Sequence, residues 1–441
     1  MDLLEFLIFL KERVLGTPSV FIFLFVGVYL TIKTRFLQIR GIPRFFSFLK
    51  GGMKKTEGGN IKTINSLHAM FAAMATSLGM GNIVGPSIAI IWGGPGALFW
   101  LIIYNFFGGI LRFTETTFAL HTRKKTEDGS IISGPTQYLK LVSKWVANWY
   151  GVIMIVVFAV WSGVQSNTLA KILAKENVPE WSVGLALAII VLIILHGGAK
   201  RVGFVASKLV PIMCFLYLSF SLLIIFKDIT ALKNAINLIF SSIFRSSSAV
   251  GGFLGATVLA AMREGIFRSI YITEAGLGTS SIPHSMSDVK KPTDQGLLAM
   301  YSIFADSFIS FISGLLVIVS GMWMVGGFTP TLIYDAFKFN LPLAVQSLGQ
   351  FVLVISISLF VITTVIGNSF NGLQSFASFT KHRWNSFYKL FTAAFIFSSA
   401  LFSAPLMWAM VDLAIIFVAV PNVISLAILA FKKPEVMKIE S

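Results

Sequence analysis

Two glycines and an asparagine lie in the middle of an otherwise apolar, helix-length stretch at residues 72–92. Glycine weakens a helix, and an asparagine side chain inside a lipid bilayer finds no water to bind, so the motif Gly79-Met80-Gly81-Asn82 predicts a break in the helix. Unwound backbone at mid-membrane depth is tolerated where it is buried in protein or lines a cavity. Its free N–H and C=O groups can bind a carboxylate and a cation there, as in secondary transporters. The alternative is a close helix crossing that uses the small residues.

The composition is that of a membrane protein with many spans. Hydrophobic residues make up 56% of the 441 residues and charged residues 12%, and the mean hydropathy is +0.82. The net charge of +16 comes from basic residues in short loops between apolar runs, which argues against nucleic acid as a partner. The single cysteine, Cys214, lies in an apolar segment, so neither a disulfide framework nor a metal cluster is expected. HExxH, Ser/His, Ser/Lys and paired-Asp arrangements of membrane-embedded enzymes are missing from the sequence.

We predict membrane helices at eleven apolar segments: 17–33, 66–92, 95–120, 146–170, 181–196, 203–226, 246–272, 294–324, 345–376, 387–404 and 406–431. When these segments alternate across a membrane, most of the 35 Lys and Arg residues fall into the loops of one side. The positive-inside rule then places the N-terminus outside and the C-terminus in the cytoplasm. Basic residues follow the first segment instead of preceding it, so it is expected to be a retained helix, not a signal peptide.

The last ten segments can be divided into two five-helix units, 66–226 and 246–431, that begin on opposite sides of the membrane. An extra N-terminal helix at 17–33 precedes them, and residues 1–441 form a single transmembrane domain. Corresponding glycine-interrupted helices in two inverted halves predict a midplane site where the halves meet. In the second unit, the interruption is predicted at Gly251, Gly252, Gly255 and then Gly265.

Charged residues inside the predicted membrane helices are few, and each is a functional hypothesis. Arg112 and Glu115 are three residues apart on one helix face and can pair, which suggests a structural or gate-forming role near the cytoplasmic end. Asp306 and Asp412 have no obvious basic neighbour in the sequence. A lone carboxylate at such a depth costs about 2.5–3.5 kcal/mol, so each needs a donor, a proton or a cation, and both packing and ion coupling are open. Glu274 is expected to act as a latch at the cytoplasmic end of its helix.

Several longer motifs occur in an order and spacing that resemble one transporter family. They are LGMGNIVG (78–85), WGGPGALFW (92–100), LRFTETTFAL (111–120), SGPTQYL (133–139), GVQSN (163–167), GGFLGATV (251–258), TEAGLG (273–278), FADS (304–307), TTVIG (363–367) and PNVISL (421–426). The chain is similar here to the alanine or glycine:cation symporter family, from about residue 60 onward. The resemblance implies an all-α fold with a five-plus-five inverted repeat of the leucine-transporter type. It also implies sodium-coupled uptake of small amino acids, without a prosthetic cofactor.

The resemblance also assigns a substrate site. At Gly79, the amides of Met80 and Gly81 would hold the carboxylate of the amino acid, because the N-terminus of a half-helix favours an anion. Gln165 and, with less support, Asn167 correspond to positions at the substrate pocket, where amide groups can bind both an ammonium and a carboxylate. An interhelical hydrogen bond is the alternative for both amides.

The sodium ligands implied by the resemblance lie on two segments. The side chain of Asn82 and the carbonyls of Ala75 and Leu78 would face the ion from the break, since freed carbonyls suit a hard cation. Thr363 and Thr364 match the paired hydroxyl residues of the family and would complete the site. The alternative is that these threonines bond to the backbone of their own helix.

One departure from the family pattern bears on the substrate. Family members typically carry Gly-Trp-Ser where this chain has Gly367, Asn368 and Ser369, and the family's Gly-Thr-Gly-Asn becomes Gly79-Met80-Gly81-Asn82. Asn368 would leave a roomier and more polar pocket than the aromatic residue. The departure predicts a larger or more polar neutral amino acid as the preferred substrate.

Together these patterns predict a sodium-driven importer of a small neutral, alanine- or glycine-like amino acid in the cell membrane, working by alternating access. Its expected ligands are the amino acid and sodium within the lipid bilayer, with no obligate protein partner. A proton-coupled transporter of the same fold is the alternative, with Asp306 or Asp412 carrying the proton. A channel is disfavoured, because midplane breaks build an enclosed site.

Overall fold

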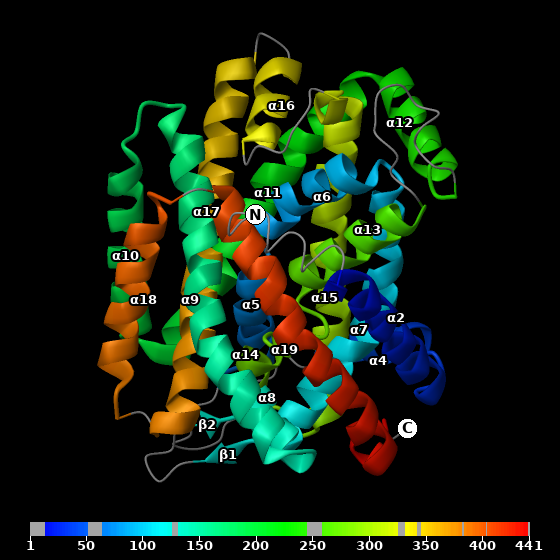
Figure 1. Ribbon diagram of the computed structural model, residues 1–441, viewed down its shortest axis with the longest axis vertical. Helices are drawn as coiled ribbons and strands as arrows, with labels where there is room; N and C mark the ends of the chain where they lie inside the picture. The colour runs from blue at the N-terminus through cyan, green and yellow to red at the C-terminus, as the bar shows by residue number, and fades with distance from the viewer. Residues whose placement is uncertain are drawn as a thin grey trace.

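The computed structural model describes residues 14–51, 64–125, 131–244, 258–324, 331–341, 345–381, 383–402 and 404–439. Long helices run side by side through most of the molecule (Figure 1). In the described part of the chain, the strands are limited to β1 (Lys124–Lys125) and β2 (Ile131–Ile132), which pair antiparallel at one end of the bundle. The helical class predicted from the sequence is therefore confirmed.

Within the described residues, each of the eleven predicted segments overlaps a helix or a bent pair of helices. They are α2 (Gly16–Lys33), α5 (Ser66–Ser77) with α6 (Met80–Gly93), α7 (Ala97–His121), α9 (Lys144–Ala174), α10 (Glu180–Leu195), α11 (Gly198–Lys227), α13 (Val258–Thr273), α15 (Pro292–Val319), α17 (Gln346–Thr380), α18 (Asn385–Ser399) and α19 (Ala404–Lys432). Among the described residues, seven of these helices are long and apolar enough to cross a bilayer, and α5 with α6 makes an eighth. The chain is a multi-pass membrane protein.

Shorter helices connect the long ones. They are α3 (Leu37–Arg40), α4 (Ile42–Gly51), α8 (Pro135–Tyr138), α12 (Ile229–Ser241), α14 (Ser281–Ser285) and α16 (Leu332–Asn340), with 3-10 turns at η2 (Leu139–Leu141), η4 (Met322–Met324) and η6 (Pro434–Met437). In Figure 1, α12 and α16 lie at the upper end of the bundle and α8 at the lower end. These connections cover the ends of the long helices.

Helices α5 and α6 lie at the centre of the bundle, and the outer helices face outward with apolar side chains. In α6 only Trp92 is exposed, whereas α11 presents Phe204 and Phe215 and α18 presents Phe387 and Leu390 on the outside, each more than half exposed. Exposed apolar side chains along helices of this length are those expected to contact lipid acyl chains. The polar groups that could do chemistry are therefore held in the middle of the bundle.

The predicted break in the first unit is confirmed. Helix α5 ends at Ser77 and α6 begins at Met80, and the two helices meet at an angle of 42°. Between them, Gly79 has an extended backbone (φ −140°, ψ −159°). A Cβ atom at Gly79 would lie 2.5 Å from the Thr364 hydroxyl oxygen, so glycine is required here for the close approach of α17.

Of the glycines predicted to mark the second break, only Gly265 lies among the described residues. Gly251, Gly252 and Gly255 lie outside the described residues. Gly265, however, lies within the continuous helix α13, where a Cβ atom would collide with the Ala97 carbonyl oxygen of α7. Gly265 therefore serves close helix packing and does not interrupt the helix.

Instead, the chain unwinds after Thr273, at the end of α13, and becomes helical again at Ser281 in α14. Glu274, Gly276 and Gly278 have left-handed backbones, with φ values of 54°, 90° and 82°. Glycine adopts such values at little cost, which explains the two glycines of the TEAGLG motif.

Candidate functional site

The two breaks meet at a small cavity in the middle of the bundle. Its walls come from α5, α6, α9, α13, α17 and the unwound segment after α13. The lining residues are Thr76, Ser77, Gly79, Gly81, Trp161, Gln165, Tyr271, Glu274, Thr364 and Asn368. The cavity encloses about 10 Å³, which admits about one water molecule. Four of the five predicted substrate residues line it, and the fifth, Met80, bonds to one that does.

The backbone amides at the first break are already engaged by side chains. The Met80 N–H donates to Gln165 Oε1 at 3.0 Å, and the Gly79 N–H donates to Asn82 Oδ1 at 3.1 Å. Gln165 reaches the break from α9 and is 2% exposed. Gln165 thus lies at the N-terminus of the half-helix α6, and the Asn82 side chain, expected to face sodium, caps the break instead.

The structure separates the two threonines that the sequence pairs. Thr364 Oγ1 donates to the Leu78 carbonyl at 2.9 Å, across the contact between α17 and the first break. Thr363 Oγ1 donates to its own helix at Leu359 and Phe360, at 2.9 and 3.0 Å, and contacts Met213 of α11. The predicted sodium role of Thr363 is thus not supported by its position, because a side chain on the adjacent residue of a helix points about 100° away.

The other expected sodium ligands share one end of α5. Ala75 is buried in the last turn of α5, and Leu78 is the buried residue that follows the helix. Asn82 is fully buried, but its Oδ1 accepts from Gly79 and its Nδ2 donates to the Asp306 carbonyl at 3.3 Å. The Leu78 carbonyl and Thr364 hydroxyl are therefore the pair of oxygens from two different helices that the structure places together.

Asn368 and Asn167 have different surroundings. Asn368 lies one turn after Thr364 in α17, and within the described part of the chain its Oδ1 has no hydrogen-bond donor. Asn167 lies away from the cavity and donates from Nδ2 to the carbonyls of Ser399 and Phe402 at 2.9 and 2.8 Å. The interhelical hydrogen bond is thus the role of Asn167.

Comparison with known proteins identifies the family of this chain. The model of the sodium:alanine symporter family matches residues 1–439. The chain belongs to this family. Among its relatives, a protein of Methanococcus maripaludis named sodium/alanine symporter AgcS is 28% identical, over 98% of this chain and 95% of the relative. A Bacillus subtilis protein named probable sodium/glutamine symporter GlnT is 29% identical, over 92% of this chain and 84% of the relative.

A solved structure shows the same fold. The crystal structure of MhsT in complex with L-phenylalanine superposes with a TM-score of 0.63 at 13% identity, covering 85% of this chain and 91% of that one. The predicted fold of the leucine-transporter type is confirmed. A member of the sodium:alanine symporter family is an amino-acid:cation symporter and not an enzyme.

In this symporter, the predicted pairing of Arg112 with Glu115 is wrong. Arg112 Nη1 bonds to Asp306 Oδ2 at 2.8 Å, and both side chains are fully buried between α7 and α15. Asp306 Oδ1 also accepts from Ser77 Oγ at 2.9 Å, at the last residue of α5. The basic partner of Asp306 was invisible in the sequence because it lies 194 residues away. The ion pair therefore supports the first break.

Glu115 supports the second break through Asn422 of α19. Asn422 Nδ2 donates to Glu115 Oε1 and to the Gly276 carbonyl, both at 2.9 Å. The Tyr138 hydroxyl donates to Asn422 Oδ1 at 2.7 Å, so the amide is bonded at both of its ends. The PNVISL motif thus contributes a residue that holds the unwound segment.

Asp412 also has a basic partner. Arg268 of α13 binds it with two bonds, Nη1 to Oδ1 at 2.8 Å and Nη2 to Oδ2 at 2.5 Å. Arg268 is fully buried inside α13. One turn away on each helix, the rings of Tyr271 and Trp408 lie 5.2 Å apart, and Trp161 packs on Tyr271 at 5.3 Å. Trp161 and Tyr271 close this side of the cavity.

Glu274 was predicted to be a latch away from the ligands, but it lines the cavity. Its Oε2 accepts from Thr76 Oγ1 at 3.2 Å and from Thr279 Oγ1 at 2.5 Å. Tyr271 and Trp161 were also missed, because an aromatic residue in an apolar helix carries no sign of its position. For Glu274, the two glycines that follow it in the TEAGLG motif were the sequence signal that could have placed it at a break.

Proposed function

We propose that this protein imports a neutral amino acid together with sodium across the cell membrane by alternating access. The observation that carries the proposal is the meeting of the Thr364 hydroxyl and the Leu78 carbonyl at 2.9 Å across the first break. Two neutral oxygens from two helices suit a hard monovalent cation. An ion between them would join α17 to α5, so its presence would bias the packing of these helices.

Gln165 supports a carboxylate site at Met80. Its Oε1 accepts from the Met80 amide the hydrogen bond that a substrate carboxylate oxygen would accept. The position is the N-terminus of α6, where the helix dipole favours negative charge. A substrate carboxylate would displace Gln165, and the freed side chain could then bind the ligand.

The ammonium group of the substrate would find two acceptors in the same cavity. The Glu274 carboxylate and the Asn368 Oδ1 both line the cavity. Because the cavity admits about one water molecule, an amino acid enters only when Gln165 and the ring of Tyr271 move. This closed site supports a mechanism in which the two ends of the bundle open in turn.

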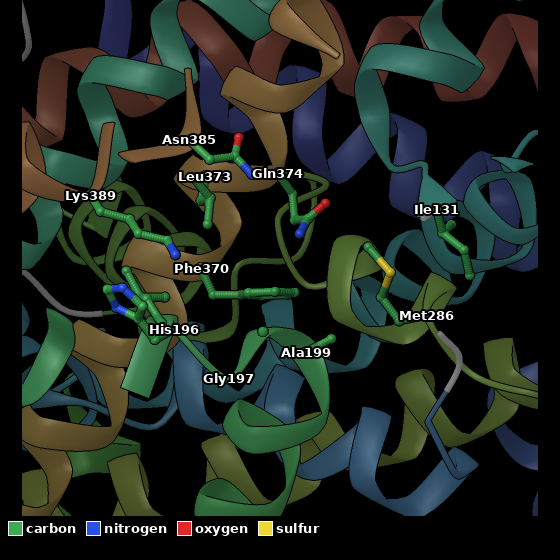
Figure 2. A pocket seen from close by; sticks show the side chains of 12 residues that line it. Ile131, His196, Gly197, Ala199, Met286, Phe370, Leu373, Gln374, Asn385 and Lys389 are labelled. Carbon is green, nitrogen blue, oxygen red and sulfur yellow. The ribbon is translucent and has the colours of Figure 1, made fainter. Parts of the chain in front are cut away.

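A second cavity lies farther along α17. It has a volume of about 360 Å³ between α17, α18 and the α10–α11 turn, and Figure 2 shows Phe370, His196 and Lys389 around it. Phe370 lies two residues beyond Asn368, so α17 borders both cavities. We propose that this larger cavity is part of the route by which ligands leave the central site.

Energy and orientation are compatible with import. One ion crossing 100 mV contributes about 2.3 kcal/mol. A tenfold sodium gradient adds about 1.4 kcal/mol, so that together they concentrate a zwitterion by roughly several hundredfold. The Lys and Arg distribution favours an N-terminus outside and a C-terminus in the cytoplasm. The two five-helix units, 66–226 and 246–431, stay a prediction.

Proton coupling is the second candidate, and Glu274 is the observation that favours it. Its described hydrogen bonds come from hydroxyl groups, whereas Asp306 and Asp412 each bond to an arginine. An arginine already balances the charge of each aspartate, so neither carboxylate needs a proton for that purpose. In the proton-coupled alternative, Glu274 would therefore carry the proton in place of Asp306 and Asp412.

The test uses purified protein in proteoliposomes and labelled alanine. We expect uptake with an inward sodium gradient, and competition by unlabelled neutral amino acids, including glycine, glutamine and phenylalanine. Uptake that is equal in sodium-free buffer at acid external pH would refute sodium coupling. Competition by none of the neutral amino acids would refute the substrate class.

A further inference from the structure

A basic cleft lies where the N-terminal helices meet the C-terminal segment, far from the central cavity. It has a volume of about 370 Å³ and is lined by Lys33, Thr34, Arg35, Leu37, Arg40, Pro434, Met437, Lys438 and Ile439. Four of these nine side chains are cationic, and none is acidic. In Figure 1, α2 and α4 approach the lower end of α19 on one side of the bundle.

The local fold brings these charges together. Helix α2 ends at Lys33 and α19 ends at Lys432, so two membrane-spanning helices end at the cleft. Lys33 Nζ lies 5.5 Å from the centre of the Phe431 ring, which connects the two helix ends. Arg35 and Phe36 both have φ values of 56°, and this turn directs the chain into α3, which carries Arg40.

No described acidic side chain neutralises the four cations. Among the described residues, none of them forms an ion pair, and Arg35, Arg40 and Lys438 are exposed. By contrast, the nearby Arg44 bonds to Asp294 at 2.9 Å. Four like charges around one cleft repel each other, and a bound anion offsets this repulsion.

The surface beside the cleft is apolar. Ile32 is 63% exposed, Phe36 50%, Ile39 59% and Phe431 74%. Ile32 and Phe431 lie at the ends of the spanning helices, and Phe36 and Ile39 lie on the segment that lines the cleft. A ligand with a phosphate group and apolar chains matches both features, whereas a free phosphate uses only the charges.

We propose that this cleft binds the headgroup phosphate of an anionic phospholipid, with the acyl chains along Ile32 and Phe431. Basic pockets beside membrane helices bind anionic headgroups in this way, and a lysine or arginine near an anionic membrane surface contributes about fivefold in affinity. The site is independent of the transported substrate and of the coupling ion. It requires only that the chain spans a membrane.

The test is native mass spectrometry of the full-length protein in neutral detergent, with added phosphatidylglycerol or phosphatidylethanolamine. The variant changes Lys33, Arg35, Arg40 and Lys438 to Gln. Its matched control changes four exposed lysines elsewhere to Gln: Lys124, Lys125, Lys200 and Lys381. We expect the cleft variant to bind phosphatidylglycerol roughly several hundredfold more weakly, and the control variant to bind it like the native protein.

Two further arms keep the result interpretable. The variant Lys33→Arg with Lys438→Arg keeps the charge and should keep the lipid. In lipid-free detergent, inorganic phosphate at millimolar concentration should leave the melting temperature of the native protein unchanged. Stabilisation by phosphate that the cleft variant loses would assign the site to free phosphate and overturn the lipid. Equal phosphatidylglycerol binding by all variants, or equal loss in the control, would overturn the site itself.

Discussion

Removing a single hydroxyl group at Thr364 tests the proposed ion site most directly. Thr364→Val keeps the shape of the side chain and deletes the oxygen that lies 2.9 Å from the Leu78 carbonyl. Thr364 is 2% exposed and lines the central cavity, so the substitution removes one oxygen from a nearly closed site. The sodium site would then keep the carbonyl oxygens of the break and lose its ligand from α17.

The expected loss of sodium affinity follows from the strength of a contact between a hydroxyl group and an ion. An interaction between a hydroxyl and a charged partner is worth about 1.5–3 kcal/mol. This corresponds to roughly a tenfold to hundredfold change in affinity. We therefore expect the half-saturating sodium concentration of Thr364→Val to rise by tenfold or more, with a smaller change in amino-acid affinity at saturating sodium.

The adjacent threonine provides a matched control. Thr363→Val makes the same change on the neighbouring residue, whose hydroxyl bonds to the backbone of its own helix at 2.9 and 3.0 Å. Sodium dependence of uptake in proteoliposomes should be near native for Thr363→Val and for Thr364→Ser. An equal loss in both valine variants, or an unchanged sodium dependence in Thr364→Val, would refute the assignment of the ion to Thr364 and Leu78.

Three further predictions concern the surroundings of the site. Gly81→Leu should abolish uptake by a folded protein, because a Cβ atom there lies 2.5 Å from the Tyr271 ring; uptake and size-exclusion profiles measure this. Asp306→Asn should lower the thermal midpoint, since removing one partner of a buried pair costs about 3–5 kcal/mol, and a second change, Arg112→Gln, should restore part of it. Asn368→Trp should shift substrate preference toward alanine and glycine in a competition assay, because the indole fills the space of a larger substrate.

Each of these three predictions would be contradicted by a specific result. Gly85→Ala is the control for the glycine, since a Cβ there meets Ile272 at 3.3 Å and α6 should tolerate it; near-native uptake by Gly81→Leu would remove the break from the substrate site. A native midpoint for Asp306→Asn would mean that Arg112 finds another partner. A native protein that already prefers alanine and glycine, with selectivity unaltered by Asn368→Trp, would exclude position 368 from the pocket.

The first break was predictable from the sequence, whereas Gly265 was wrongly included in the second, for one physical reason. Glycine serves both unwound backbone and close helix packing. At Gly79, Asn82 distinguishes the two, because a buried amide needs a backbone group to bond and finds the Gly79 N–H. Gly265 has no such neighbour and packs against α7, whereas the left-handed Gly276 and Gly278 mark the actual break.

The charged pairs could not be predicted from spacing. A pair three residues apart on a helix is the natural hypothesis for Arg112 and Glu115. In the fold, α15 brings Asp306 to Arg112, and α19 brings Asn422 to Glu115. Which helices pack together is decided by the whole bundle, and no local pattern in these segments contains that information.

The buried polar contacts connect the two breaks through Glu274. It lies at the start of the second break and accepts hydrogen bonds from Thr76, at the end of α5, and from Thr279, just before α14. If α5 moves away from the second break, Glu274 loses the hydrogen bond that it accepts from Thr76. A buried hydrogen bond that is left unmade costs about 1–3 kcal/mol. A substrate ammonium is the group able to replace that donor. In the proposed cycle, substrate binding would thus lower the cost of separating the two breaks, and this supplies the differential interaction that alternating access requires.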